Sequence, residues 1–527
     1  MSETIAIIGA GYVGVPLGDV FAAAGHSIVL VDVQQSRVDR LNRGDSYVED
    51  VPSERLKEHV DAGRLRATTD YDEIREADAI LIALPTPLSD QREPDLSIVF
   101  DATRGIASRL RKGHLVVLES TTYPGTTRDS LKPILEESGL SAGEDFHLAF
   151  SPERVDPGRE DWTTKTTPKV VGGLTEACTR RAVELYESAL DTVLPLSSPE
   201  AAELTKLLEN IFRSVNIALV NELAQLCDRM DLDVWEIVDA AATKPFGFMR
   251  FDPGPGMGGH CLPVDPFYLA WRAREFDFYT EFIELAGKIN QSMPYFCVDK
   301  IVPVSTPEVA ELSKLLENIF RSVNIALVNE MAMLCERLGI DVWEVIDAAA
   351  SKPFGFMRFD PGPGMGGHCL PVDPFYLSYK AREHDFYTEF IELAGKINQN
   401  QPHWCVRRIE RALNDAGKAT NGSRVLLLGV SYKAGVGDIR ESPALKIIGL
   451  LRDLGADVSY HDPHVAELPD LDLASAGLEE SLAASDLVCI VTAHPTIDYQ
   501  QVVDDSALVL DFRGVTRGIE ASNLVRL

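Results

Sequence analysis

The chain has 527 residues, more than one ordinary hydrophobic core can organise, so two to four domains are expected. Its apolar content of 45% and charged content of 25% are those of globular proteins, and no apolar run approaches the ~20 residues that a membrane span needs. A net charge of −31 argues against nucleic acid and anionic membranes as partners, because phosphate binding requires clustered Lys and Arg.

The eight cysteines are spread along the chain without a C-x-x-C pair, which argues against both a disulfide scaffold and a zinc ribbon. No metal site is expected. The first residues, MSETIAIIGAG, lead directly into a strand without a basic leader. The sequence therefore predicts a cytoplasmic protein with reduced thiols.

The N-terminal segment has the pattern strand, glycine turn, helix, strand. Ile5 to Ile8 precede the turn Gly9-Ala10-Gly11-Tyr12-Val13-Gly14, a helical pattern runs to about Ala24, and Ile28 to Val31 end at Asp32. Such a turn lets a pyrophosphate lie on the helix N-terminus, and an acid after the second strand suits a ribose 2′-hydroxyl while repelling a 2′-phosphate. The pattern predicts an NAD site.

Further strands alternate with helical segments and predict a continuing parallel sheet. They are expected at 79–84, 115–119 and 147–150. Each runs into a polar turn, which places Thr86, Thr121 and Glu153 on the cofactor side, since ligands bind beyond the carboxyl ends of such strands. Taken singly, each is equally well explained as a turn residue.

Residues 199–230 contain neither Gly nor Pro after Pro199, and their apolar spacing predicts one long helix with Ser198 as its N-cap. Its length would be on the order of 45 Å, more than one small domain needs, so it is expected to pack on a second copy of itself. Lys206 and Asn210 share one face of this helix, as solvated polar pairs also do on many helices.

A tandem repeat follows: residues 194–301 align without gaps to 302–409, and 73 of the 87 positions from Leu204 to Asn290 are identical 108 positions later. Solenoid repeats are much shorter, so this pattern indicates a duplicated domain. We call these segments the first and second repeat. Both keep Lys, Asn, Cys and Asp at equivalent positions: Lys206, Asn210, Cys261 and Asp265, then Lys314, Asn318, Cys369 and Asp373.

Each repeat contains the stretch KPFGFMRFDPGPGMGGHCLPVDPFYL, at 244–269 and 352–377. Its glycines and prolines predict a loop that can approach a ligand closely. Cys261 and Cys369 are the candidate nucleophiles, although a free cysteine is more often a small buried hydrophobe. That second interpretation is preferred for the six other cysteines: Cys178, Cys227, Cys297, Cys335, Cys405 and Cys489.

After Asn414 a second α/β pattern begins, without a glycine fingerprint. Strands are expected at 424–429, 457–461, 487–491 and 508–511, with a helix at 442–454. The first turn carries Lys433 and Arg440, which suit phosphates but are equally common as exposed loop residues.

These patterns predict an α/β protein in which two Rossmann-like, doubly wound domains flank a helical central domain that is present twice. The expected boundaries are an NAD-binding domain at 1–193, central domain copies at 194–301 and 302–409, and a second Rossmann-like domain at 410–527.

An NAD fold beside a reactive thiol suggests oxidation through a thioester. An alcohol carbon would lose hydride to NAD+, the Cys261 thiolate would trap the aldehyde, a second hydride would leave, and water would release a carboxylate. A lysine and an asparagine suit the developing oxyanion, and Asp265 or Glu153 could serve the water.

With these residues assembled, the chain resembles the UDP-glucose/GDP-mannose dehydrogenase family over nearly its full length. The matching stretches are GAGYVG at 9–14, LPTP at 84–87, ESTTYPGTT at 119–127, SPERVDPG at 151–158, KLLEN at 206–210, GGHCLPVDP at 258–266 and YKAGVGDIRESPA at 432–444. Within the family, SPERVDPG followed by PKVVGG and KPFGFM look most like UDP-N-acetylglucosamine 6-dehydrogenases of surface polysaccharide synthesis. UDP-glucose and UDP-N-acetylmannosamine are the alternative substrates.

The resemblance implies that the domain at 410–527 binds the UDP-sugar, and it implies a role for each matching residue. Cys261 would be the nucleophile, Lys206 and Asn210 would stabilise the oxyanion, and Asp265 would assist the thiol or water. Thr121 and Glu153 would take part in hydride transfer and hydrolysis. The implied NAD ligands are Gly9, Gly11, Tyr12, Val13, Gly14, Asp32, Arg37, Thr86, Thr121 and Arg440, and the implied substrate ligands are Arg250, Gly258, Arg358 and Lys433.

The chain departs from the family pattern in three places. Family members carry one central domain, whereas this chain repeats it. Gly435 and Gly437 stand where relatives often have acids, and Pro157 stands where many UDP-glucose enzymes have a second glutamate, which favours an acetamido sugar.

Relatives are similar to dimers built on the long helix, so the repeats are expected to pair within the chain as a pseudo-dimer, or chains to form homo-oligomers. Cys261 is expected to face the nicotinamide, and Cys369 to lie in a site that lacks its own NAD domain. Three alternatives stay open: an enzyme impaired by the duplication, a binding module without activity, and, remotely, a metal-dependent hydrolase using His260-Cys261 and His368-Cys369.

Overall fold

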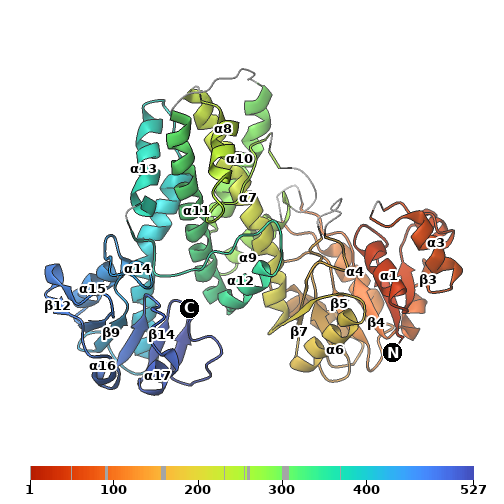
Figure 1. Cartoon of the computed structure of the whole chain (residues 1–527). Coiled ribbons are helices and arrows are strands. Elements are labelled where there is room, and N and C mark those ends of the chain that lie inside the picture. The colour runs from red at the N-terminus through yellow and green to blue at the C-terminus, as the bar shows by residue number, and fades with distance from the viewer. Residues whose placement is uncertain are drawn as a thin grey trace. The chain divides into compact units, whose positions relative to one another are not determined.

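The computed structural model describes residues 2–48, 50–89, 93–155, 162–230, 232–254, 256–257, 262–298, 308–367 and 369–527 (Figure 1). The chain divides into two compact units. The first unit comprises Met1–Arg213, Gly258–Tyr279 and Glu344–Arg358, and the second comprises Ser214–Met257, Thr280–Trp343 and Phe359–Leu527. Each unit therefore contains parts of both repeats.

The first unit contains an eight-stranded sheet in the order β3-β2-β1-β4-β5-β6-β7-β8. Its strands are β1 (Thr4–Ile8), β2 (Ser27–Val31), β3 (Leu65–Thr68), β4 (Ala79–Ile82), β5 (Leu115–Leu118), β6 (His147–Phe150), β7 (Lys169–Gly173) and β8 (Val193–Leu196). The order from β3 to β6 is that of a doubly wound dinucleotide fold, as predicted. The parallel arrangement ends at β6, which pairs antiparallel with β7, because the described residues between these strands form no crossover helix.

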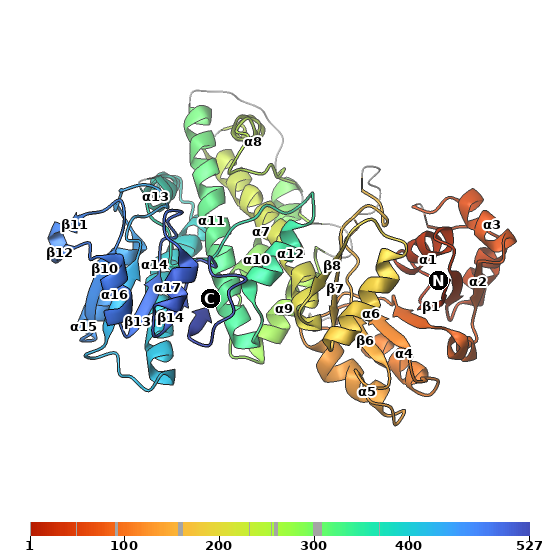
Figure 2. The same cartoon turned by 60° about the horizontal axis from the view of Figure 1, so that its bottom comes forward.

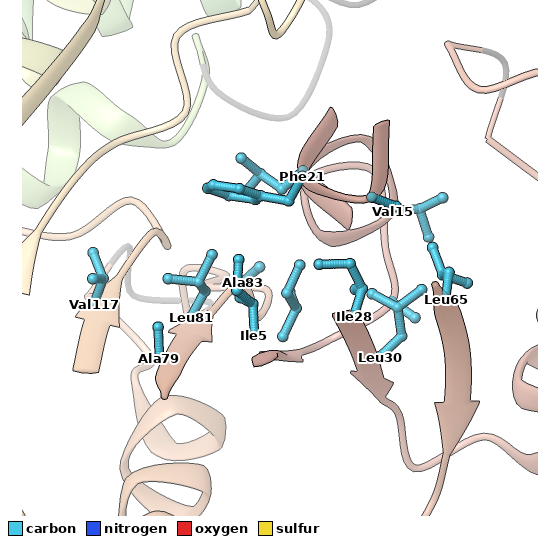
Figure 3. Packing of buried hydrophobic residues seen from close by; sticks show 14 of the residues in the cluster. Ile5, Val15, Phe21, Ile28, Leu30, Leu65, Ala79, Leu81, Ala83 and Val117 are labelled. Atoms are coloured by element: carbon cyan, nitrogen blue, oxygen red, sulfur yellow. The ribbon is translucent and has the colours of Figure 1, made fainter. Parts of the chain in front are cut away.

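The helices of this sheet are α1 (Gly14–Ala23), α2 (Gln35–Asn42), α3 (Ser53–Asp61), α4 (Ser97–Ala107), α5 (Lys132–Glu136) and α6 (Glu176–Glu187), with a 3-10 turn at Tyr71–Glu76 and a π turn at Thr126–Leu131. In the close view, Phe21 and Val15 of α1 lie over Ile5, Ile28 and Leu81 of the sheet (Figure 3). Full burial of an aromatic side chain such as Phe21 stabilises by ~1.5–3 kcal/mol, so this packing fixes the turn that precedes α1.

The described residues of each repeat form four helices. The first gives α7 (Pro199–Arg229), α8 (Val234–Ala242), α9 (Asp265–Arg274) and α10 (Glu281–Val298), and the second gives α11 (Glu308–Leu338), α12 (Val342–Ala350), α13 (Cys369–Arg382) and α14 (Glu389–Asp415). The long helix predicted after Ser198 is confirmed, and the Ser198 hydroxyl accepts the N–H of Ala201. The loop predicted at 244–269 is wrong at its end, where Asp265 begins α9, because Pro266 is tolerated in a first helical turn.

The two repeats contact each other reciprocally within the second unit. Glu222 accepts the N–H of Glu389 at 2.8 Å, and Glu330, 108 positions after Glu222, accepts the N–H of Glu281 at 2.9 Å. A carboxyl group from each long helix thus caps the last helix of the other repeat. Helices α8, α13 and α14 pack against α11 beside these contacts (Figure 1).

The C-terminal sheet of the second unit has the parallel order β10-β9-β13-β14-β15. Its strands are β9 (Arg424–Leu428), β10 (Asp457–His461), β13 (Leu487–Ile490), β14 (Val509–Asp511) and β15 (Leu524–Arg526), beside a hairpin of β11 (Glu467–Leu468) and β12 (Leu473–Ala474) and a 3-10 turn at Pro469–Leu471. The order is again that of a doubly wound sheet, which confirms the predicted fold class.

Helices cover both faces of this sheet. They are α15 (Pro443–Asp453), α16 (Leu478–Ala484) and α17 (Tyr499–Asp504), together with the end of α14 (Figure 2). One buried cluster joins α14 and α15 to one face of β9, and another joins α16 and α17 to the opposite face. Among the described residues, no helix combines the length and apolarity that a bilayer crossing requires.

Candidate active site

The glycine turn after β1 is closely packed on one side and open on the other. A Cβ at Gly9 would lie 2.4 Å from the Ala83 carbonyl oxygen, and one at Gly14 would lie 1.9 Å from the Gly9 carbonyl oxygen. Gly9 also has a φ of +102°, which side chains rarely adopt. At Gly11, by contrast, an added Cβ would meet nothing within 4 Å. The turn therefore leaves room for a ligand at Gly11, as a pyrophosphate requires.

Asp32 lies at the end of β2, as predicted, with 8% of its surface exposed. Its carboxylate accepts the N–H of Ala10 at 3.1 Å and that of Gln34 at 2.9 Å, and it lies 3.5 Å from the Arg37 guanidinium. These bonds tie the second strand to the glycine turn. Tyr12 is two-thirds exposed beside them. The geometry fits the ribose side of a dinucleotide site.

The turns after β4 and β5 meet the first repeat. The Leu84 N–H donates to the Ser120 hydroxyl at 2.9 Å, which joins the two turns. The Tyr268 hydroxyl of α9 donates to the Thr86 carbonyl oxygen at 2.9 Å. Thr121 is half-buried next to Ser120. Helix α9 is thus held at the carboxyl edge of the NAD sheet.

Lys206, Asn210 and Asp265 come together at this edge. The Asn210 side-chain amide donates to the Asp265 carboxylate, and the Lys206 ammonium donates to the Glu153 carbonyl oxygen at 2.7 Å. All three side chains are nearly fully buried. The predicted pair on one helical face is therefore turned inward, not toward solvent.

The environment of Asp265 shifts its pKa toward neutral pH. Burial raises the pKa of Asp265 to about 6, while Lys206 and the Asn210 amide oppose the rise by favouring the carboxylate. A carboxyl group with this pKa is mainly ionised at neutral pH yet can hold a proton.

Glu153 belongs to a buried charge network that the sequence reasoning missed. Lys169 of β7 lies 2.6 Å from the Glu119 carboxylate and 3.8 Å from that of Glu153, and the Tyr186 hydroxyl donates to Glu119. Burial would raise the pKa of Glu153, but Lys169 and the N–H of Val155 outweigh it and lower the pKa. The signal in the sequence is a lysine at the start of the buried strand KVVGG, because a buried lysine requires a partner.

The second unit contains a cavity of about 190 Å³ beyond β9. It is lined by Pro363, Gly364, Tyr432, Lys433, Ala434, Pro443, Val491, Thr492, Ala493 and Arg513. Lys433 was predicted as a substrate ligand from its turn, whereas Arg513, which lies 80 positions later in the chain, was not predicted. Two cations in one cavity suit a diphosphate.

Three further predicted ligands are arginines on exposed loops. Arg440 forms an ion pair with Asp438 at 2.6 Å, Arg250 lies 2.8 Å from Asp252, and Arg358 pairs with Asp347. Each is thus held by a neighbouring acid of its own unit.

Several predicted residues lie outside what the structure describes. These are Gly258 and Cys261, and the side chains of Lys314, Cys369 and Asp373, although the backbone places Lys314 on α11 and begins α13 at Cys369. Asn318 is buried on α11. Cys178, Cys227, Cys335, Cys405 and Cys489 are buried free thiols, as predicted, while Cys297 has no described side chain. No group of three or more His, Cys, Asp or Glu side chains within the described ranges could hold a metal ion.

Three domain types of one known protein family match this chain. The NAD binding domain of the UDP-glucose/GDP-mannose dehydrogenase family matches residues 3–190, the central domain matches 200–292 and 308–400, and the UDP binding domain matches 426–518. The chain therefore belongs to the UDP-glucose/GDP-mannose dehydrogenase family. It is an NAD-dependent nucleotide-sugar dehydrogenase.

Among its relatives, UDP-N-acetyl-D-mannosamine dehydrogenase of Pyrococcus horikoshii is 28% identical over 98% of this chain and 99% of its own length. The enzyme of that name from Escherichia coli is 38% identical over 56% of this chain and 71% of its own length. The solved GDP-mannose dehydrogenase of Pseudomonas aeruginosa, 21% identical, covers 99% of both chains with a TM-score of 0.65, which supports the fold.

Proposed function

We propose that the protein oxidises the C6 primary alcohol of UDP-N-acetyl-D-mannosamine to the uronic acid. The names of its relatives support this sugar over the UDP-N-acetylglucosamine expected from the sequence motifs. The observation that carries the chemistry is the convergence of Lys206, Asn210 and Asp265 beside the carboxyl edge of the NAD sheet. UDP-N-acetylglucosamine is the second candidate, because SPERVDPG and KPFGFM favour it.

The proposed reaction gives one chemical task each to Cys261, Lys206, Asn210 and Asp265. Bound NAD supplies the hydride acceptor for both oxidation steps. The Cys261 thiolate adds to the aldehyde and later leaves as water attacks the thioester. Lys206 and Asn210 donate hydrogen bonds to the oxyanion of each tetrahedral species. Asp265, with its pKa near 6, accepts the proton released by the thiol or by the attacking water.

The proposal includes the four domains predicted from the sequence, with the repeats as two copies of the central domain. The family's central-domain description matches one range in each repeat. Helices α7 and α11 each have 31 residues, and α8 and α12 each have 9, which also supports the duplication. We assign the working thiol to Cys261, because the first unit contains both the NAD sheet and the Lys206 cluster. The cavity with Lys433 and Arg513 would hold the nucleotide diphosphate.

The direct test is NADH formation on adding each of several UDP-sugars to the purified protein. Two NADH per sugar are expected with UDP-N-acetylmannosamine, because four electrons leave one carbon. Cys261→Ser should abolish turnover and Cys369→Ser should preserve it. No NADH with any UDP-sugar, despite NAD binding, would refute the activity and leave a binding module. Activity that survives only in Cys261→Ser would move the site to the second repeat.

A further inference from the structure

A second buried charge cluster lies behind the candidate catalytic lysine, around Glu209 of α7. Glu209 is fully buried, three residues after Lys206 and one before Asn210. The Arg154 guanidinium lies 2.8 Å from its Oε1 atom, and the Lys352 ammonium lies 3.1 Å from its Oε2 atom. Each oxygen of this carboxylate therefore has its own cation.

Lys352 comes from the second repeat, although the cluster belongs to the first unit. Arg154 also donates to the Ala348 carbonyl oxygen at 3.1 Å and to the Ser351 hydroxyl at 3.0 Å, at the end of α12. The segment that follows α12 thus docks on the loop after β6, through a buried arginine. This docking delivers Lys352 to Glu209.

The cluster contains more positive than negative charge. Glu209 faces Arg154 and Lys352 directly, and the charge of Lys206 also acts on it. Burial lowers the pKa of Lys352 to about 8, Glu209 opposes this fall, and the nearby cations Lys206 and Arg213 add to it. Buried cations in such a group compete for one carboxylate.

Lys206, unlike Arg154 and Lys352, forms no ion pair with Glu209 among the residues that the structure describes. Its ammonium donates to the Glu153 carbonyl oxygen at 2.7 Å, toward the candidate site, while both oxygens of Glu209 are occupied by other cations. Without Lys352, the Oε2 atom of Glu209 would be the nearest uncompensated negative charge on the same face of α7. Lys206 would then be drawn to it.

The second repeat's own cluster provides an internal comparison. Lys244 pairs with Glu317, which are the positions equivalent to Lys352 and Glu209. There the two side chains are 23% and 19% exposed, against 2% and 0% for Lys352 and Glu209. Identical residues thus form a partly exposed pair in one place and a desolvated pair in the other. Only the desolvated pair lies in the unit that contains the NAD sheet.

We propose that Lys352 is a positioning residue for Lys206: by occupying Glu209, it keeps the Lys206 ammonium directed toward the reacting oxygen. This inference rests on the proposed function, because it takes Lys206 as the oxyanion donor. It makes the second repeat a required part of the first repeat's site.

The kinetic test compares Lys352→Met, Lys352→Arg and Lys244→Met. For Lys352→Met we expect kcat to fall about tenfold or more, with the KM for NAD changed less than about twofold, since a donor to the transition state is misplaced while cofactor binding is kept. Lys352→Arg should restore most of kcat, and Lys244→Met should stay within about twofold of wild type. Unchanged kcat in Lys352→Met, or an equal loss in Lys244→Met, would overturn the proposal.

A crystal structure of Lys352→Met gives a readout that needs no turnover. Lys206 should leave the Glu153 carbonyl oxygen and form an ion pair with Glu209, whereas in Lys352→Arg it should stay in place. If Lys206 keeps its bond to Glu153 in Lys352→Met, the positioning role is refuted, even when the wild type is active. If the wild type oxidises no UDP-sugar, the proposed function fails while the position of Lys206 still decides this inference.

Discussion

The Asn216 side-chain amide donates to the amide oxygen of Asn324 at 2.9 Å, and Asn324 donates back to Asn216 at 2.8 Å. The two residues are 108 positions apart, which is the offset of the repeats. The bond therefore joins a position to its own equivalent, and the two long helices meet there as they would at a two-fold axis.

Asn216→Ala should destabilise the second unit by ~1–3 kcal/mol, because it leaves the buried Asn324 amide with an unpaired oxygen. Urea unfolding measures the loss. Replacing both residues by Leu should cost less than the sum of the single Leu substitutions, since no polar group then stays unpaired. Strictly additive losses would show that the pair contributes no coupling.

Glu222 and Glu330 predict a dependence of stability on pH. Burial raises the pKa of each carboxyl group to about 8, against the opposing effect of the backbone N–H groups that each one accepts. The pKa of each group is higher in the folded state than its unfolded value of about 4.5. The free energy of unfolding is therefore highest below pH ~4.5 and falls as pH rises toward 8.

The matched variants are Glu222→Gln and Glu330→Gln, which stay neutral and can still accept these bonds. Denaturant unfolding at pH 5 and at pH 9 compares each variant with the wild type. From pH 5 to pH 9 the stability of each variant should rise relative to that of the wild type, by on the order of a few kcal/mol. A stability difference between wild type and variants that stays the same at pH 5 and pH 9 would show that the carboxylates are ionised in the folded protein at both pH values.

Lys169→Met should destabilise the first unit by ~3–5 kcal/mol, because Glu119 would lose its only described cation partner while staying buried. The double variant Glu119→Gln with Lys169→Met should recover part of the loss, since the uncompensated charge is then removed. Thermal unfolding compares the variants. A double variant less stable than Lys169→Met would contradict this account.

The pKa of Asp265 predicts that kcat falls on the acidic side of its pH profile. Its pKa near 6 means that the carboxylate is lost as pH falls through that value, so kcat should decline below about pH 6. Asp265→Asn should lower kcat by about 10²–10⁴-fold and remove this limb. A limb that persists in Asp265→Asn would belong to another group.

The fold could be predicted largely from the sequence, because hydrophobic periodicity and glycine turns are local signals. The first strand, the glycine turn and Asp32 occupy their expected places within a residue or two. Antiparallel β7 was not predicted, because strand direction depends on where the chain returns to the sheet.

Some residues of the candidate site could likewise be predicted from the sequence, and others could not. Lys206 and Asn210 could be paired from their spacing of four residues on one helix. Their buried neighbours could not, because Arg154 and Lys352 meet Glu209 from 55 and 143 positions away. Spacing along a chain carries no information about partners brought together by folding.

The repeat shows most directly what the sequence alone determined: two nearly identical segments form the same set of helices, since helix formation depends on local pattern. Tertiary structure decided the environment of each copy. Trp235 is 48% exposed, while its equivalent Trp343 is 1% exposed. Gly514 packs against the Trp343 ring, and the guanidinium carbon of Arg517 lies 5.2 Å from the centre of that ring. Burial is set by what packs against a residue, and Gly514 and Arg517 of the C-terminal segment pack against Trp343.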